Sequence, residues 1–379
     1  MACTSEASRS DRVERSGWVG VRARVRVVVT GLCLIGVGCS SAFFYPDRHQ
    51  RLEPDEIGLT FEDVHFSSEG GDGVMLHGWL LHPRPKAHPA RGTVLFLHGN
   101  AENISTHIRS VHWLPAEGFR VFLFDYRGYG LSEGRSTIAS VHRDAEAALR
   151  TLLARDDVDS RRLVVFGQSF GAAVALSTVA RLQGEVEIRA LVLDSAFSEF
   201  RGIAREKLSA HWLTWALQWP LSLTVPNRPN PLDAIASLKA IPVLLIHGEA
   251  DRVVPLHHSQ RLQAAAAVPA SLWIAPGAGH IEALRDPRWR ERLLAFLDGA
   301  LSREDRPAGE ASDPTRPPPG VSSMLVHPAS EGESARSSKG KPRVVQASMP
   351  PSSGRTRPIP LRCSLSASRA LEASFGQVQ

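Results

Sequence analysis

Cysteine is nearly absent from this 379-residue chain. The cysteines are Cys3, Cys33, Cys39 and Cys363. The stretch between residues 40 and 362 therefore has no disulfide, no thiolate metal site and no cysteine nucleophile. Its composition is otherwise ordinary, with 43% hydrophobic and 22% charged residues over the whole chain. A sizeable buried core is therefore expected.

A basic stripe is also lacking in the middle of the chain. The formal net charge is +5, but residues 1–39 carry +3 and residues 303–379 carry +4. The residues between these flanks carry −2. Since nucleic-acid binding needs clustered positive charge, the sequence predicts no nucleic-acid partner.

The apolar run near the N-terminus is too short for a comfortable transmembrane helix. It extends from Val27 to Val37 and follows three arginines, an order typical of a signal peptide. Cys39 follows a small residue in a pattern that resembles the lipobox of bacterial lipoproteins, in which the cysteine is lipidated. We expect residues 1–39 to target the chain to a membrane, as a lipoprotein signal or as an uncleaved anchor. The following domain would then be exported, to the periplasm or the outer surface.

Regular hydrophobic spacing disappears after about Ser302. Residues 303–379 are rich in Pro, Ser, Arg and Gly, and their apolar residues follow neither a helical nor a strand period. Such a segment cannot bury enough apolar surface to offset the entropy lost on ordering. We predict that it is a disordered tail, which carries no recognisable motif.

Short apolar runs alternate with helix-like segments over residues 40–302. The expected strands are 61–67, 74–81, 93–97, 120–124, 163–166, 190–193, 243–246 and 271–275. The expected helices include 104–117, 140–155, 170–182 and 287–301. This alternation predicts an α/β fold with a mostly parallel sheet and helices on both faces. Functional residues are then expected directly after strands, at their carboxyl ends.

The alternation stops at about residues 197–231, which predicts a small helical cap insertion. This stretch contains Trp212, Trp215 and Trp219 among several leucines. The aromatic residues could pack onto the core, or they could belong to a lid that lines an apolar substrate pocket. The position of the insertion above the strand ends favours the lid.

The sharpest motif is Gly167-Gln168-Ser169-Phe170-Gly171, which follows an expected strand and precedes an expected helix. A G-x-S-x-G sequence in this context is typical of a tight turn that exposes a nucleophilic serine. The start of the helix supplies free N–H groups and a favourable dipole to an oxyanion beside the serine. Ser169 is therefore the candidate nucleophile.

The serine needs a base and an acid that orients the base, in the chain order Ser, acid, His. His280 is the candidate base because it lies in a glycine-rich loop after the last expected strand. Asp251 is the candidate acid, since it follows the strand at 243–246. Asp194 ends the preceding strand and is the alternative acid, with Glu249 a weaker third.

An oxyanion hole needs two N–H donors. The backbone of Phe170 is one candidate, because it directly follows the nucleophile. The loop after the strand at 93–97 supplies the other, from Asn100 or alternatively Ala101. We expect His98 to shape this loop through a structural hydrogen bond.

Further histidines are expected to have structural roles. His247 ends a strand and is interpreted as a turn residue. His257 and His258 begin a helix and are expected to face solvent.

Several segments together resemble a known family. They are 43–46 (FFYP), 98–101 (HGNA), 125–132 (DYRGYGLS), 167–171 (GQSFG), 247–255 (HGEADRVVP) and 279–280 (GH). Over roughly residues 43–300 the chain resembles the α/β-hydrolase superfamily, close to its Bem46-like and serine aminopeptidase S33-like groups. The resemblance implies a triad of Ser169, Asp251 and His280, and a structural loop at 125–130. It also implies esterase, thioesterase or peptidase activity and, commonly, membrane anchoring.

The sequence therefore predicts a serine hydrolase that cleaves a small-molecule or acyl substrate through an acyl-enzyme. This chemistry requires no metal and no organic cofactor. Two other classes of function stay open. One is a non-catalytic, membrane-tethered binding protein with this fold, and the other is a structural lipoprotein whose tail carries the function.

Overall fold

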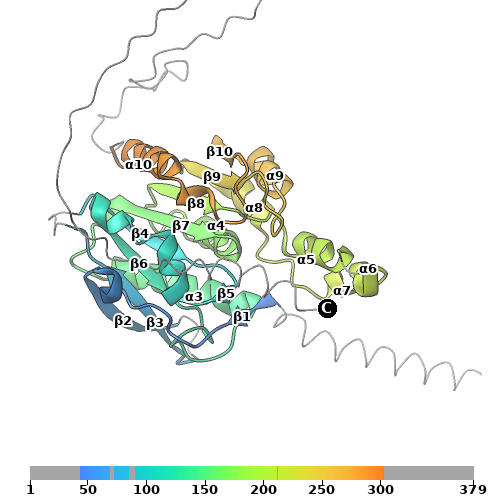
Figure 1. Ribbon diagram of the computed structural model, residues 1–379, viewed down its shortest axis with the longest axis horizontal. Coiled ribbons are helices and arrows are strands. Elements are labelled where there is room, and N and C mark those ends of the chain that lie inside the picture. The colour runs from blue at the N-terminus through green and yellow to red at the C-terminus, as the bar shows by residue number, and fades with distance from the viewer. Residues whose placement is uncertain (1–42, 69–71, 85–89, 211, 303–379) are drawn as a thin grey trace, which may run out of the picture. The chain divides into compact units, whose positions relative to one another are not determined.

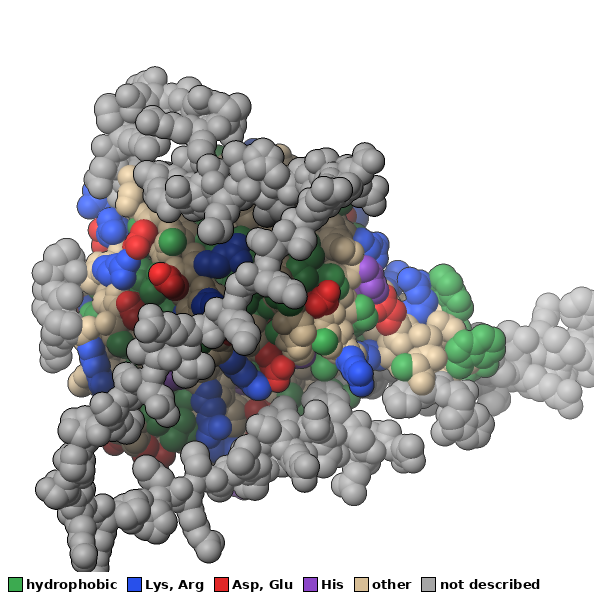
Figure 2. Space-filling view, turned by 45° about the horizontal axis from the view of Figure 1, so that its top comes forward, with side chains coloured by type: hydrophobic (Ala, Val, Ile, Leu, Met, Phe, Trp, Pro, Cys, Tyr) green, Lys and Arg blue, Asp and Glu red, His purple; other side chains and the backbone are tan. Residues whose placement is uncertain are grey.

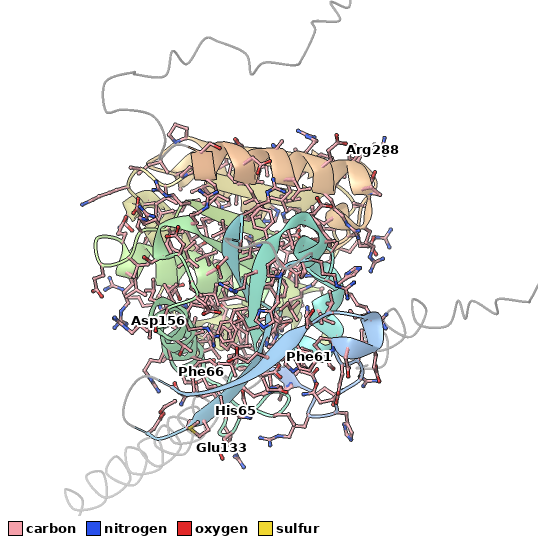
Figure 3. All side chains as sticks on the ribbon, turned by 90° about the vertical axis from the view of Figure 1, so that its left-hand side faces the viewer. Phe61, His65, Phe66, Glu133, Asp156 and Arg288 are labelled. Carbon is pink, nitrogen blue, oxygen red and sulfur yellow. The ribbon has the colours of Figure 1, made fainter. Side chains whose placement is uncertain are left out.

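An eight-stranded, mostly parallel sheet forms the centre of the computed structural model, which describes residues 43–302 apart from 69–71, 85–89 and 211 (Figure 1). The strands are β2 (Phe61–Ser67), β3 (Met75–Leu81), β4 (Gly92–Leu97), β6 (Phe119–Phe124), β7 (Leu163–Gln168), β8 (Ala190–Asp194), β9 (Val243–Gly248) and β10 (Ala270–Ala275). Their order in the sheet is β10-β9-β8-β7-β4-β6-β3-β2, and only the β2–β3 and β3–β6 pairs are antiparallel. Figure 3 shows the β2 edge, where Phe61, His65 and Phe66 are labelled.

Helices cover both faces of this sheet. The main ones are α2 (Ile104–His107), α3 (Ile138–Leu153), α4 (Phe170–Leu182), α8 (Pro231–Ser237), α9 (His257–Ala265) and α10 (Pro287–Leu301). Alternate residues of β4 face opposite layers: Leu95 packs in the core with α3, α4 and α8, whereas Phe96 packs in the core with α2 and α10. Burial on both faces explains why the central strands are continuously apolar. The predicted α/β architecture is confirmed.

One predicted helix is wrong. The segment 104–117 is not continuous, because α2 ends at His107 and is followed by the 3₁₀ turns η3 (Ile108–Ser110) and η4 (Leu114–Glu117). Pro115 lies in this segment, and proline has no N–H to continue an α-helical ladder. Gly118 ends the segment with a φ of 84°, the left-handed conformation that glycine favours.

Three short helices form the cap between β8 and α8. They are α5 (Phe200–Ser209), α6 (Trp212–Trp215) and α7 (Gln218–Leu223), and Figure 1 shows them projecting beyond the sheet. Among the described residues, no helix is both long and apolar enough to cross a membrane. The targeting segment predicted for residues 1–39, including Cys39, and the tail predicted for 303–379 lie outside the described residues.

Candidate active site

Ser169 lies in the sharp turn between β7 and α4. Its φ of 54° and ψ of −117° form a strained backbone conformation that persists only where the surrounding structure enforces it. The glycines on either side allow the turn to close. A Cβ on Gly167 would lie 2.4 Å from the carbonyl oxygen of Gly171, and one on Gly171 would lie 2.2 Å from that of Leu97. The serine is therefore held where strand and helix approach too closely for larger residues.

His280 connects the serine to an acid. Its Nε2 lies 2.9 Å from Ser169 Oγ, and its Nδ1 lies 2.7 Å from Asp251 Oδ2. The loop that carries the histidine packs against the end of β9, where a Cβ on Gly248 would lie 2.3 Å from the carbonyl oxygens of residues 278 and 279. The structure thus brings together the three residues that the sequence analysis selected.

Asp251 is held by more than the imidazole. Its Oδ1 accepts hydrogen bonds from the backbone N–H groups of Val253, at 2.8 Å, and Val254, at 2.9 Å. Burial acts to raise the pKa of Asp251, but the hydrogen bond and charge of His280, with smaller effects of the Val254 N–H and His247, outweigh burial and lower it. The carboxylate is therefore ionised at neutral pH and directed at Nδ1.

The alternative acid, Asp194, contacts other groups. Its Oδ2 accepts a hydrogen bond from Gln168 Nε2 at 3.0 Å, and its Oδ1 accepts one from Ser195 Oγ at 3.3 Å. Its backbone oxygen accepts the N–H of Ser169 at 2.8 Å. Burial raises the pKa of Asp194 to about 6. Asp194 therefore supports the turn beneath the serine, and no hydrogen bond joins it to His280 in the described structure.

Ser195 is a supporting residue that the sequence analysis missed. Its φ of 54° departs from the usual region, and its Oγ accepts the backbone N–H of Ile281 at 3.2 Å. Ile281 directly follows His280 and itself has a φ of 51°. The end of β8 thus helps to position the histidine loop. The only signal in the sequence was the position of Ser195 directly after a strand.

The loop after β4 lies beside the nucleophile. A Cβ on Gly99 would lie 3.9 Å from Ser169 Cβ. Asn100 is held by its carbonyl oxygen, which accepts the N–H of Tyr45 at 2.9 Å and the hydroxyl of Tyr129 at 2.6 Å. Its side-chain amide donates to the carbonyl oxygen of Phe43 at 2.8 Å. Within the described structure no acceptor meets the backbone N–H of Asn100, so it remains available as a donor.

A buried pair of titratable groups lies beneath this loop. His98 Nδ1 donates to the carbonyl oxygen of Gly99 at 2.7 Å, and its Nε2 lies 3.7 Å from Asp125 Oδ1. That carboxyl oxygen also accepts the N–H of Ile104 at 2.9 Å. Burial lowers the pKa of His98 well below its usual value and raises that of Asp125 to about 8. At neutral pH both groups are therefore uncharged.

Replacing Asp125 by asparagine is expected to flatten the dependence of stability on pH. The unfolded carboxyl loses its proton near pH 4 but the folded one only near pH 8, so the unfolding free energy of the native chain falls as pH rises between these values. A neutral amide removes this loss, which is on the order of a few kcal/mol. Urea unfolding at pH 5, 6, 7 and 8 measures the unfolding free energy of both chains. Parallel plots of this free energy against pH would contradict the raised pKa of Asp125.

A second cluster joins the cap to the body of the fold. Glu206 on α5 contacts two histidines of α9: Oε1 lies 3.1 Å from His257 Nε2, and Oε2 lies 3.1 Å from His258 Nε2. The expectation that both histidines face solvent is wrong for His258, which is fully buried and accepts the N–H of Ser198 at Nδ1. The sequence could not show that α5 covers it.

The same three side chains form the cluster of potential metal ligands that the described residues contain, with ligand atoms within 4.8 Å of one another. Since His258 Nδ1 accepts a hydrogen bond from a backbone N–H, the proton of this neutral ring lies on Nε2 and points to Glu206. The cluster is therefore internally hydrogen-bonded and joins α5 to α9. It requires no ion to do so.

Comparisons with known proteins agree with this architecture. The family described as "Serine aminopeptidase, S33" matches residues 88–238. The chain is 36% identical over 268 residues to the uncharacterized protein YfhR of Escherichia coli strain K12, which covers 69% of this chain and 88% of that protein. It is 28% identical over 221 residues to protein bem46 of Schizosaccharomyces pombe, covering 57% of this chain and 69% of that one.

A solved structure resembles the fold more directly. The Pyrococcus furiosus esterase Pf2001 superimposes with a TM-score of 0.55 and 25% sequence identity, over 68% of this chain and 99% of the esterase. The fold, the S33 match and the identity to YfhR lead to the same assignment. The chain belongs to the α/β-hydrolase superfamily and carries a hydrolase domain of the serine aminopeptidase S33 type.

Proposed function

We propose that the chain is a serine hydrolase that cleaves an acyl ester, thioester or amide through an acyl-enzyme on Ser169. The observation that carries this proposal is the continuous hydrogen-bonded path from Asp251 through His280 to Ser169 Oγ, with distances of 2.7 and 2.9 Å. The resemblance to the Pyrococcus furiosus esterase supports an ester as the substrate to test first.

The geometry supports a two-step mechanism. His280 Nε2 takes the proton of Ser169 as its Oγ attacks the substrate carbonyl, and Asp251 stabilises the imidazolium and keeps the proton at Nδ1. The N–H groups of Phe170 and Asn100 then stabilise the oxyanion. His280 returns the proton to the leaving group. In the second step it activates water, which releases the acyl group. This mechanism requires no metal or organic cofactor.

A fluorophosphonate probe tests the nucleophile. We expect the full-length chain to be labelled at Ser169, because this probe phosphonylates only a serine that a neighbouring base activates. The Ser169→Ala chain is expected to lose the label. Ser177→Ala is the matched control, since Ser177 is also buried on α4 but donates to the carbonyl oxygen of Ala173. Peptide mapping locates the label. A folded chain without any label would favour the non-catalytic binding role.

We further propose that residues 1–39 attach the domain to a membrane, with export to the periplasm or outer surface. The support is the sequence alone: arginines, then an apolar run, then Cys39. Fractionation of cells that express the full chain, with Cys39→Ser as the variant, distinguishes lipidation from an uncleaved anchor.

A further inference from the structure

Exposed hydrophobic side chains gather on the cap. Of the nine large hydrophobic residues that the described structure exposes, four belong to it. They are Trp215 (62% exposed), Leu217 (51%), Trp219 (62%) and Leu223 (60%), which we call the cap patch. Figure 2 shows hydrophobic side chains concentrated at the tip of the molecule where α6 and α7 project. A concentration of exposed apolar surface of this kind is typical of an interaction surface.

Positive charge accompanies the cap patch. Between residues 201 and 230 the chain has four basic residues and one acidic residue. The acidic one, Glu206, is already engaged by the histidines of α9. Arg205 stacks its guanidinium over the Trp219 ring, 4.4 Å from the centroid. Exposed tryptophan and leucine with an arginine beside them favour the boundary between lipid headgroups and acyl chains.

The chain enters the described structure beside the cap. Phe43 packs edge-to-face against Phe200, the first residue of α5, with ring centroids 6.5 Å apart. Residues 38–42 alone separate Phe43 from the apolar run that ends at Val37. Since a residue spans at most about 3.5 Å, a membrane-embedded run would keep Phe43 within about 20 Å of the bilayer. The start of the cap would then lie equally near the membrane.

We propose that the cap patch binds the surface of an anionic phospholipid bilayer. The proposal rests on the membrane attachment of residues 1–39 and goes beyond the proposed hydrolase activity. Attachment makes the second contact intramolecular, with an effective concentration in the millimolar range for a short link. A contact too weak to hold a free protein on a membrane can therefore keep the cap of the attached protein on the bilayer. Trp215 and Trp219 insert at headgroup depth, and Arg205, which stacks on Trp219, approaches the lipid phosphates.

Tryptophan quenching by brominated lipids tests the contact. The full-length chain is placed in nanodiscs of phosphatidylcholine and phosphatidylglycerol whose acyl chains are brominated near the headgroup. We expect quenching that largely disappears in the Trp215→Phe, Trp219→Phe chain. The matched control, Trp273→Phe with Trp289→Phe, removes two partly buried rings that pack together on β10 and α10, and should leave the quenched signal in place. Equal quenching in all three chains would overturn the proposal.

Hydrogen exchange of peptides from 212–224 provides a second measurement. Slower exchange on anionic nanodiscs than on discs of phosphatidylcholine alone supports the proposal. Protection that depends on protein concentration and not on lipid charge would show a second copy of the chain on the cap patch, and would overturn it. Fluorophosphonate labelling of the same samples reports the hydrolase site independently. A variant that loses the lipid contact but keeps its fluorophosphonate label, or the reverse, therefore separates the membrane proposal from the hydrolase proposal.

Discussion

Replacing Asp251 by asparagine is expected to lower kcat of the proposed hydrolysis by about 10⁴-fold. The backbone N–H groups of Val253 and Val254 both donate to Asp251 Oδ1, so the amide oxygen of the variant must occupy that position. Its NH₂ group then points at His280 Nδ1. The imidazole then accepts a hydrogen bond at Nδ1 and carries its proton on Nε2. A protonated Nε2 cannot take the proton of Ser169. We expect the fold to be retained, because the side chains of aspartate and asparagine have nearly the same shape.

Ester hydrolysis, measured as kcat and KM with a p-nitrophenyl ester series, tests this expectation. Asp194→Asn is the matched control: it is also a buried carboxylate at a strand end, but it contacts Gln168 and Ser195. We expect it to lower kcat less than about tenfold. Losses of equal size in the two variants, or a larger loss in Asp194→Asn, would reject Asp251 as the residue that orients the histidine.

Replacing Gly171 by alanine is expected to destabilise the fold by about 4 kcal/mol or more. The added Cβ would lie 2.2 Å from the carbonyl oxygen of Leu97 and 2.3 Å from that of His98. Both are backbone atoms in and directly after β4, so no side chain can rotate away to relieve the contact. The start of α4 would have to move off the sheet, and Ser169 with it.

Urea unfolding of the full chain measures this effect, with Gly299→Ala as the matched control. Gly299 lies in α10, and a Cβ there would meet no heavy atom within 4 Å. Since alanine is the better helix former, we expect Gly299→Ala to stabilise the chain by up to about 1 kcal/mol. If Gly171→Ala unfolded at the same urea concentration as the native chain, the close approach of α4 and β4 would be refuted.

Most of the fold could be predicted because its signals are local. The central strands are short, continuously apolar runs between polar or glycine-containing turns, and both bounds of α4 agree with the prediction. The prediction of a continuous helix at 104–117 was wrong for a reason that is also local. Its apolar residues have helical spacing, but the α-helix ends at His107, and Pro115 cannot continue the hydrogen-bond ladder farther along. Spacing alone does not show where the hydrogen-bond ladder is interrupted.

The cap illustrates a different limit. The sequence indicated a helical insertion rich in tryptophan, and α5 to α7 lie within its predicted range. It could not show whether these side chains face the core, a pocket or solvent. Trp215 and Trp219 are each 62% exposed, which rules out packing onto the core for these two residues. Exposure depends on what covers a helix, and that is decided by contacts between distant segments.

The sequence by itself determined the α/β architecture and the position of Ser169 in a turn between strand and helix. Both follow from short-range constraints: the alternation of short apolar runs with helical segments along the chain, and the glycines that a close approach of strand and helix requires. The tertiary structure decided which carboxylate meets the imidazole. Asp194 and Asp251 both follow strands, but Asp194 turns toward Gln168 beneath the serine, whereas Asp251 reaches His280. That difference depends on the directions of side chains from separate strands, which no local pattern encodes.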